Sequence, residues 1–202
     1  MGYKIVEYRP GKFRVVSDSG EAEEETHPYF RPRFKELKYR MFWGGADINP
    51  ELYGEKNRGL SHCSDGADKL DISLYELCKK NGLAAGGICR GAQFLWAMSG
   101  GKLVQDIKPR HFSPHMVDGK GLSFIVNSYH HQGCILTDGK PPNGITVLAM
   151  HRGVVEAFEG VNKDGVSVVA VQWHPEMLDP MYTCAEFFER KLEEINADTK
   201  VR

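Results

Sequence analysis

The sequence has no marked excess of charge of either sign and no long apolar run. It contains 26 Lys and Arg against 27 Asp and Glu, which gives no reason to expect a nucleic acid or an anionic membrane as a partner. No apolar stretch approaches the length of a transmembrane helix, and residues 1–7 lack the pattern of a signal peptide. We therefore expect a cytoplasmic protein that binds neither nucleic acid nor membrane.

Cysteine is also sparse, and its spacing is irregular. An odd number of cysteines without a Cys-x-x-Cys pair suits a reducing compartment and argues against a disulfide framework or a structural zinc site. The histidines in His62-Cys63 and in residues 111–115 show no coherent ligand spacing, so we predict no metal and no other cofactor. The five cysteines are Cys63, Cys78, Cys89, Cys134 and Cys184.

The chain of 202 residues is long enough for one domain with a large core. The sequence predicts alternating helices and strands in the first half of the chain and hairpin-like strands in the second half. This order predicts an α/β layer fold with a mixed sheet.

The local patterns place the expected elements along the chain. Residues 18–26, which are acidic and polar, are expected to form an exposed loop. The last two of the expected strands should form a hairpin. The expected helices cover residues 27–38, 68–82 and 179–194, with a further helix after Cys89, and the expected strands cover residues 3–8, 12–17, 39–43, 83–85, 123–127, 144–149, 153–158 and 166–172.

The segment around Cys89 has the form of a nucleophile elbow. Gly87-x-Cys89-x-Gly91 lies between a short apolar strand and a helix, in the G-x-S-x-G pattern with a thiol in place of the hydroxyl. The helix N-terminus would face the sulfur and favour the thiolate, and the N–H of Arg90 would point at a developing oxyanion. The alternative is a buried cysteine in an ordinary strand–turn–helix.

A cysteine nucleophile needs a base and a group that orients the base. His174-Pro175-Glu176 follows the apolar strand 166–172, and strand ends are where α/β enzymes place such groups. His174 can take the thiol proton, and Glu176 can hold the imidazole in the required tautomer. Taken alone, His174 would be interpreted as a surface or half-buried histidine. Its occurrence together with the nucleophile elbow favours a role as the catalytic base.

These motifs together resemble a known family. The segments around Cys89 and His174 look like those of class I glutamine amidotransferases, and the remaining segments resemble the γ-glutamyl hydrolase (peptidase C26) branch, closest to γ-glutamyl-γ-aminobutyrate hydrolases. The resemblance covers about residues 41–188. It rests on Gly87–Gln93, Val171–Glu176, Gly44–Gly54, Gly100–Ile107, Val126–Gln132 and Val154–Ala157.

The resemblance implies a flavodoxin-like three-layer fold. Its central, mostly parallel sheet would carry β-hairpin additions in the C-terminal half. It also implies a catalytic site at the carboxyl edge of that sheet, in which Cys89 is the nucleophile, His174 the base and Glu176 the third member.

The resemblance further implies an oxyanion hole and a substrate pocket. The N–H groups of Gly45 and Arg90 would form the hole, and a Gly-Gly pair after a buried strand does let a backbone N–H approach a ligand closely. Gln93, His131 and Gln132 match positions that line the γ-glutamyl pocket. Alternative structural roles are that Gln93 caps or braces a loop and that one of His130 and His131 packs inward.

The sequence departs from the family pattern in two places. Trp43 stands where the family usually has a proline before the Gly-Gly pair. The first 40 residues are atypical, because the usual strand–helix–strand start is absent or replaced. We expect a single domain over residues 1–202 with a frayed tail at 195–202.

The predicted function is hydrolysis of a γ-glutamyl amide through a thioester, with a small molecule as substrate. One alternative is a glutaminase subunit that delivers ammonia to a separate synthetase chain. Another is a non-catalytic binding module on the same fold, against which the intact Cys89, His174 and Glu176 argue. The leaving amine and the formation of a homodimer are left open by the sequence.

Overall fold

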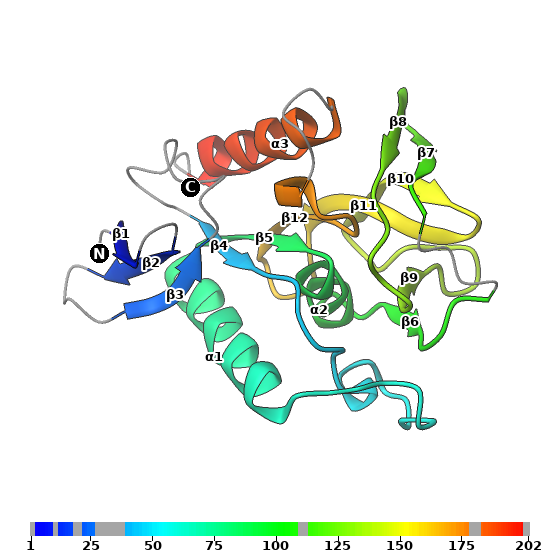
Figure 1. Cartoon of the computed structure of the whole chain (residues 1–202), viewed down its shortest axis with the longest axis horizontal. Coiled ribbons are helices and arrows are strands. Elements are labelled where there is room, and N and C mark those ends of the chain that lie inside the picture. The colour runs from blue at the N-terminus through cyan, green and yellow to red at the C-terminus, as the bar shows by residue number, and fades with distance from the viewer. Residues whose placement is uncertain are drawn as a thin grey trace. The chain divides into compact units, whose positions relative to one another are not determined.

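The computed structural model describes residues 3–9, 12–17, 22–26, 39–108, 113–177 and 183–199. The chain divides into two compact units, Met1–Lys38 and Tyr39–Arg202 (Figure 1). The boundary lies close to residue 41, where the stretch of motifs quoted for the resemblance begins. The grouping of residues 1–202 into one domain stays a prediction.

The first unit contains an antiparallel sheet in the order β1-β2-β3, built from β1 (Tyr3–Arg9), β2 (Lys12–Ser17) and β3 (Ala22–Thr26). The prediction of an exposed loop over residues 18–26 is wrong for β3. Glutamate is a poor strand former, but backbone pairing with β2, from Phe13 opposite Thr26 onward, decides the conformation. The predicted helix at 27–38 lies outside the described residues.

The second unit holds the α/β part of the chain. Its helices are α1 (Asp65–Asn81), α2 (Arg90–Met98), α3 (Thr183–Thr199) and the short 3-10 turns η2 (Pro50–Tyr53) and η3 (Pro175–Met177). Its strands are β4 (Tyr39–Phe42), β5 (Ala84–Ile88), β6 (Lys102–Val104), β7 (His115–Gly119), β8 (Leu122–Val126), β9 (Gly133–Ile135), β10 (Ile145–His151), β11 (Val154–Val161) and β12 (Ser167–Val171).

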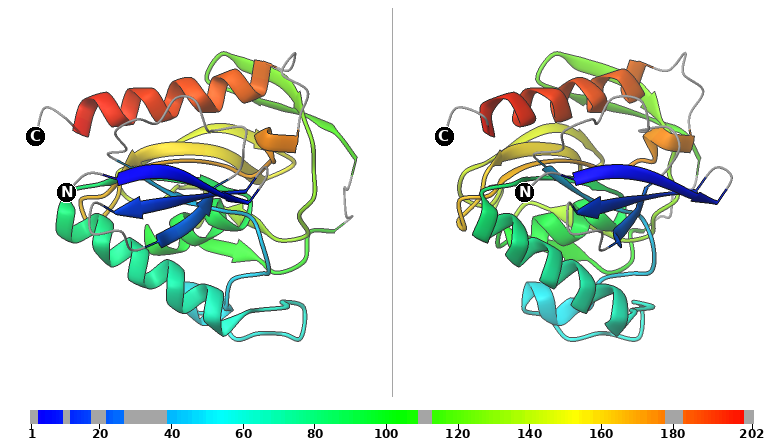
Figure 2. Two further views of the ribbon diagram at one scale, coloured as in Figure 1. Left: turned by 60° about the vertical axis from the view of Figure 1, so that its left-hand side comes forward. Right: turned by 90° about the vertical axis from the view of Figure 1, so that its left-hand side faces the viewer.

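These strands form one mixed sheet with the main order β4-β5-β12-β11-β10-β7-β8, and β9 joins β11 to β6. Figures 1 and 2 show α3 on one face of this sheet and α1 and α2 on the other. This three-layer arrangement confirms the α/β class. The antiparallel strands β7 to β11 are the hairpin additions expected in the C-terminal half. The predicted hairpin of β11 and β12 is also present, because these two strands pair antiparallel.

Among the described strands, parallel pairing joins β4 to β5 and β5 to β12. Phe42 lies opposite Gly87, and Ile88 lies opposite Val171. Because parallel strands end at the same edge, the three segments that follow β4, β5 and β12 meet there. These segments carry the Gly-Gly pair, Cys89 and His174.

The two longer helices follow the expected signals, with shifted ends. Helix α1 begins three residues before the predicted start, with Asp65 and Asp68 in its first turn, and ends at Gly82 in a left-handed conformation. Helix α3 continues to Thr199, through most of the tail that was expected to fray. Within the part of the chain that the structure describes, no helix combines the length and apolar character needed to cross a membrane.

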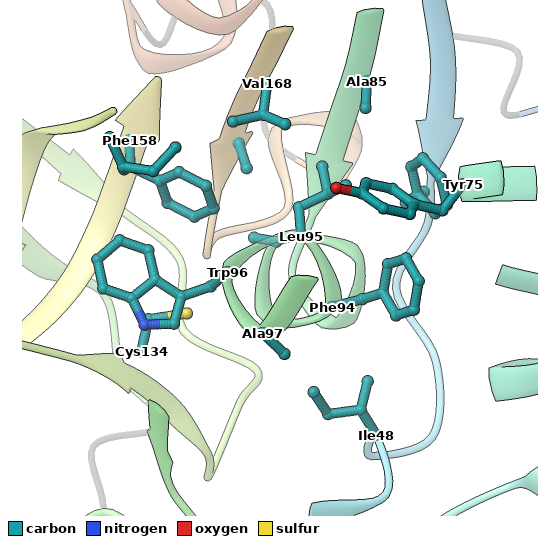
Figure 3. Packing of buried hydrophobic residues seen from close by; sticks show 14 of the residues in the cluster. Ile48, Tyr75, Ala85, Phe94, Leu95, Trp96, Ala97, Cys134, Phe158 and Val168 are labelled. Carbon is teal, nitrogen blue, oxygen red and sulfur yellow. The ribbon is translucent and has the colours of Figure 1, made fainter. Parts of the chain in front are cut away.

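Helix α2 lies at the centre of the hydrophobic core (Figure 3). Its Trp96 packs edge-on against Phe158 of β11, with the ring centres 5.0 Å apart. On the other side its Phe94 stacks on Phe42 of β4 at 5.2 Å and meets Tyr75 of α1 at 6.0 Å. The helix that follows Cys89 is therefore held on both sides, which fixes the direction of the elbow.

Candidate active site

Cys89 lies at the turn between β5 and α2 in a strained backbone conformation, with φ 51° and ψ −107°. Positive φ is costly for a residue with a Cβ and persists only where the surroundings enforce it. The two neighbouring glycines explain how the turn closes. A Cβ on Gly91 would overlap the carbonyl group of Phe42, and a Cβ on Gly87 would lie 2.9 Å from the backbone of Gly91. The elbow therefore needs glycine at both positions.

His174 and Glu176 lie together beyond the end of β12. Nδ1 of His174 donates to Oε1 of Glu176 at 2.6 Å, because a carboxylate oxygen can only accept. This bond places a hydrogen on Nδ1 and turns Nε2 away from Glu176. The imidazole also hydrogen-bonds the Cys89 side chain, so the structure brings Cys89, His174 and Glu176 into one connected group.

The environment of His174 favours its protonated form. Burial alone would lower the pKa of His174, but hydrogen bonds and charge interactions with Cys89 and Glu176 outweigh burial and raise it to about 10. At neutral pH the imidazole is therefore an imidazolium. A cation beside the sulfur stabilises a thiolate, the reactive form of a cysteine.

Asn127, just after β8, holds the backbone of His174 from both sides. Its Nδ2 donates to the carbonyl oxygen of His174 at 2.8 Å, and its Oδ1 accepts from the N–H of His174 at 2.8 Å. Asn127 is buried, so these bonds are shielded from water. Tyr129 packs edge-on against the His174 ring at 6.0 Å between ring centres and is 62% exposed.

The Gly44-Gly45 pair passes next to both His174 and Arg90. A Cβ on Gly44 would lie 2.6 Å from Cε1 of His174, which is closer than real Cβ contacts allow. A Cβ on Gly45 would lie 3.4 Å from Cδ of Arg90. The chain therefore needs glycine at position 44 to pass the imidazole, and it brings Gly45 beside the first residue of α2.

Gln93 and Gln132 belong to a buried amide network. Nε2 of Gln93 donates to the carbonyl oxygen of Gln132 and to Oε1 of Gln172, both at 3.2 Å. Nε2 of Gln132 donates to Oγ of Ser61 at 2.6 Å, while its Oε1 is buried and has no hydrogen-bond partner among the described residues. Gln93 thus braces the loop before β9. Substrate contact by Gln93 and Gln132 stays a prediction.

The two neighbouring histidines differ as expected. His130 is buried, and its Nδ1 donates to the carbonyl oxygen of Gln132 at 2.8 Å. His131 is partly exposed, and its Nε2 contacts Oδ2 of Asp47 at 3.0 Å. The same carboxylate oxygen accepts from the N–H of His62 at 2.8 Å. His131 is thereby tied to the loop that follows the Gly-Gly pair.

Sequence reasoning missed Asn127, Gln172 and Asp47 as parts of this site. Each stands inside or beside a motif quoted for the family, and each follows an apolar strand, which is a usable signal. Within the described ranges, no group of three or more His, Cys, Asp or Glu side chains is arranged to hold a metal ion.

Comparison with known proteins shows which family the chain resembles. The family model for peptidase C26 matches residues 29–121 and 115–176. The protein YvdE of Lactococcus lactis, provisionally described as glutamine amidotransferase-like, is 32% identical over 178 residues, which is 77% of this chain and 71% of YvdE. Protein NtpR of Enterococcus hirae is 31% identical over 158 residues, which is 66% of this chain and 64% of NtpR.

A solved structure shows the same fold at lower identity. It is a protein from Thermoplasma acidophilum provisionally described as a GMP synthase subunit, with a TM-score of 0.58 and 21% identity over 81% of this chain and 75% of that chain. The flavodoxin-like fold is thus confirmed, and the family relationship supports cysteine-dependent amide hydrolysis as the general chemistry. The chain belongs to the peptidase C26 family and is an enzyme of the class I glutamine amidotransferase-like type.

Proposed function

We propose that the protein hydrolyses a γ-glutamyl amide through a γ-glutamyl thioester on Cys89. The observation that carries the proposal is the connected group of three side chains at the strained turn. Cys89 is hydrogen-bonded to His174, and His174 donates to Glu176 at 2.6 Å. Nucleophile, base and orienting carboxylate stand in the order that covalent acyl transfer requires.

In the first half of the reaction, the Cys89 thiolate attacks the γ-carbonyl carbon. A carbon–sulfur bond forms, and the electron pair of the carbonyl moves to its oxygen. When the tetrahedral intermediate collapses, the carbon–nitrogen bond breaks and His174 gives its proton to the leaving nitrogen. The products are the free amine, the thioester and a neutral His174.

In the second half, water attacks the thioester and gives a proton to His174. Collapse of the second intermediate breaks the carbon–sulfur bond, releases glutamate and restores the thiolate beside the imidazolium. Glu176 holds the same tautomer of His174 throughout, because its hydrogen bond to Nδ1 is maintained. No cofactor or metal enters either half.

Both intermediates carry an oxyanion that needs hydrogen-bond donors. The N–H groups of Gly45 and Arg90 suit this role, since the Gly45 segment passes beside Arg90 at the start of α2. Well-placed donors of this kind contribute about 3 kcal/mol each to transition-state stabilisation.

A second candidate is a glutaminase that passes ammonia to a synthetase chain. The observation in its favour is the exposed apolar surface next to His174. Tyr129 is 62% exposed and packs on the His174 ring, and Met177 is 61% exposed with its N–H bonded to the carbonyl oxygen of His174. A partner that receives ammonia would cover this surface. The hydrolase is preferred because the group around Cys89 is assembled without a partner.

The test is glutamate release from glutamine and from a panel of γ-glutamyl amines, with Cys89→Ala as the control. The hydrolase predicts release from at least one γ-glutamyl amine by the isolated chain and none by Cys89→Ala. Release from glutamine alone, or release that appears only after host extract is added, would favour the partner-dependent glutaminase. Undiminished release by Cys89→Ala would refute both.

A further inference from the structure

Arg90 has a buried side chain that points away from solvent into a pair of carboxylates on α1. Its Nη2 donates to Oδ1 of Asp68 at 2.6 Å, and its Nη1 contacts Oδ2 of Asp71. All three side chains are nearly inaccessible to water. The first residue of the nucleophile helix is therefore tied to α1 by two charge-assisted bonds.

Asp68 has a second partner that Asp71 does not share. Its other oxygen, Oδ2, accepts from the backbone N–H of Asn49 at 3.0 Å. Asn49 closes the loop that contains Gly44 and Gly45, so one carboxylate contacts both segments that supply the proposed oxyanion donors. Burial raises the pKa of the Asp71 carboxyl, and Arg90 offsets only part of this effect.

An oxyanion hole works only if its donors keep a fixed separation, because a displaced donor no longer reaches the oxygen of the intermediate. The donors here come from two segments that are distant in sequence. The Gly45 side is an exposed loop, while the Arg90 side is the buried start of a helix. Something must hold the loop at a set distance from the helix.

We propose that Asp68 is a positioning residue for the oxyanion hole, because it binds the Arg90 side chain and the loop of Gly45 at the same time. This inference rests on the proposed hydrolysis. Asp68 itself touches neither substrate nor sulfur. It acts through the two backbone segments that it joins.

The bond on the loop side can be removed without touching Asp68 or Arg90. Asn49 has φ −64°, which a proline can adopt, and proline has no N–H. Asn49→Pro therefore deletes the donor to Asp68. Asn49→Ala is the matched control, because both variants lose the bond that Oδ1 of Asn49 accepts from Glu51 while alanine keeps its own N–H. Asp68→Asn is the second variant, since its amide can satisfy only one of the two donors.

Each variant is measured for kcat, for KM and for the rate at which iodoacetamide alkylates Cys89. Alkylation needs the thiolate but forms no oxyanion. We expect Asn49→Pro and Asp68→Asn to lower kcat about 10- to 100-fold, which is less than the roughly 100- to 1,000-fold loss caused by removal of a whole oxyanion donor. Alkylation should be unchanged, and KM should change less than about threefold. Asn49→Ala should stay within about twofold of the wild type.

Three outcomes would overturn the inference. In the first, Asn49→Pro and Asn49→Ala have the same kcat. In the second, Asp68→Asn keeps the wild-type kcat. In the third, alkylation falls together with kcat, which would place the defect at the nucleophile. An active wild type with unaffected variants refutes this inference alone, whereas a wild type that releases no glutamate from any substrate refutes the proposed function and this inference with it.

Discussion

Asn127→Ala should damage the site more than its effect on stability would suggest. The variant removes two buried hydrogen bonds of 2.8 Å to the backbone of His174. It leaves the N–H of His174 without its partner, while the carbonyl oxygen keeps the bond from the N–H of Met177 at 3.1 Å. An unsatisfied buried polar group costs about 1–3 kcal/mol and the loss of a second hydrogen bond about 1 kcal/mol, so we expect a loss of about 2–4 kcal/mol in the free energy of unfolding. Displacement of the imidazole by even about 1 Å should lower kcat about 100-fold.

Asn162→Ala is the matched control. Asn162 is a second buried asparagine whose Nδ2 donates to the Tyr75 hydroxyl at 2.7 Å and whose Oδ1 accepts from the N–H groups of Asp164 and Val166 at 3.1 Å. Its partners lie in the β11–β12 turn, in α1 and, through Oγ of Ser99 at 3.4 Å, at the end of α2 that is remote from Cys89. It should lose about as much stability as Asn127→Ala but keep its kcat within about twofold.

Urea denaturation gives the free energies of unfolding, and kcat is measured at saturating substrate under conditions where both variants are folded. The reasoning is refuted if the two variants lose the same fraction of kcat. It is also refuted if Asn127→Ala keeps the wild-type kcat despite the loss of stability. In the first case Asn127 is only structural, and in the second His174 does not depend on it.

Two further predictions follow from the pKa of His174 and from the packing of Gly91. Burial opposes protonation of His174, but Cys89 and Glu176 raise the pKa of His174 from 6.5 to about 10. The imidazolium therefore stabilises the fold fully below pH 6.5, and this stabilisation is lost as the pH rises through about 10. Urea denaturation between pH 6 and about 10.5 should show a weaker pH dependence for Cys89→Ala than for the wild type, and equal slopes would contradict the coupling. Gly91→Ala places a Cβ on the Phe42 carbonyl and should cost about 1–3 kcal/mol or more. Gly66→Ala, whose Cβ meets no atom of the described part of the chain within 4 Å, should not destabilise the fold. Thermal denaturation compares the two, and an unchanged melting temperature for Gly91→Ala would refute the close approach.

The parts of the site that could be predicted are those whose chemistry is local. The elbow carries its own requirements, because Cys89 needs a glycine on each side to reach its backbone conformation. His174 and Glu176 could be paired because they are two residues apart at the end of an apolar strand. Such patterns are visible in a single stretch of sequence.

The parts that could not be predicted depend on which distant segments meet. Asn127 reaches His174 only because the segment after β8 returns to the end of β12, although β11, β10 and β7 separate these two strands in the sheet. Asp68 reaches Asn49 and Arg90 only because α1 packs beside β4 and β5. The acidic strand β3 was missed for the same reason, since its conformation is decided by its partner β2 and not by its own residues.

The most direct test of the central claim is to trap the covalent intermediate. The protein is mixed with a γ-glutamyl amide, quenched in acid within the first turnover, digested and analysed by mass spectrometry. We predict a γ-glutamyl group on the peptide that contains Cys89 and none on the peptides of Cys63, Cys78, Cys134 or Cys184. Turnover without an adduct on Cys89, together with full activity of Cys89→Ala, would contradict the thioester mechanism.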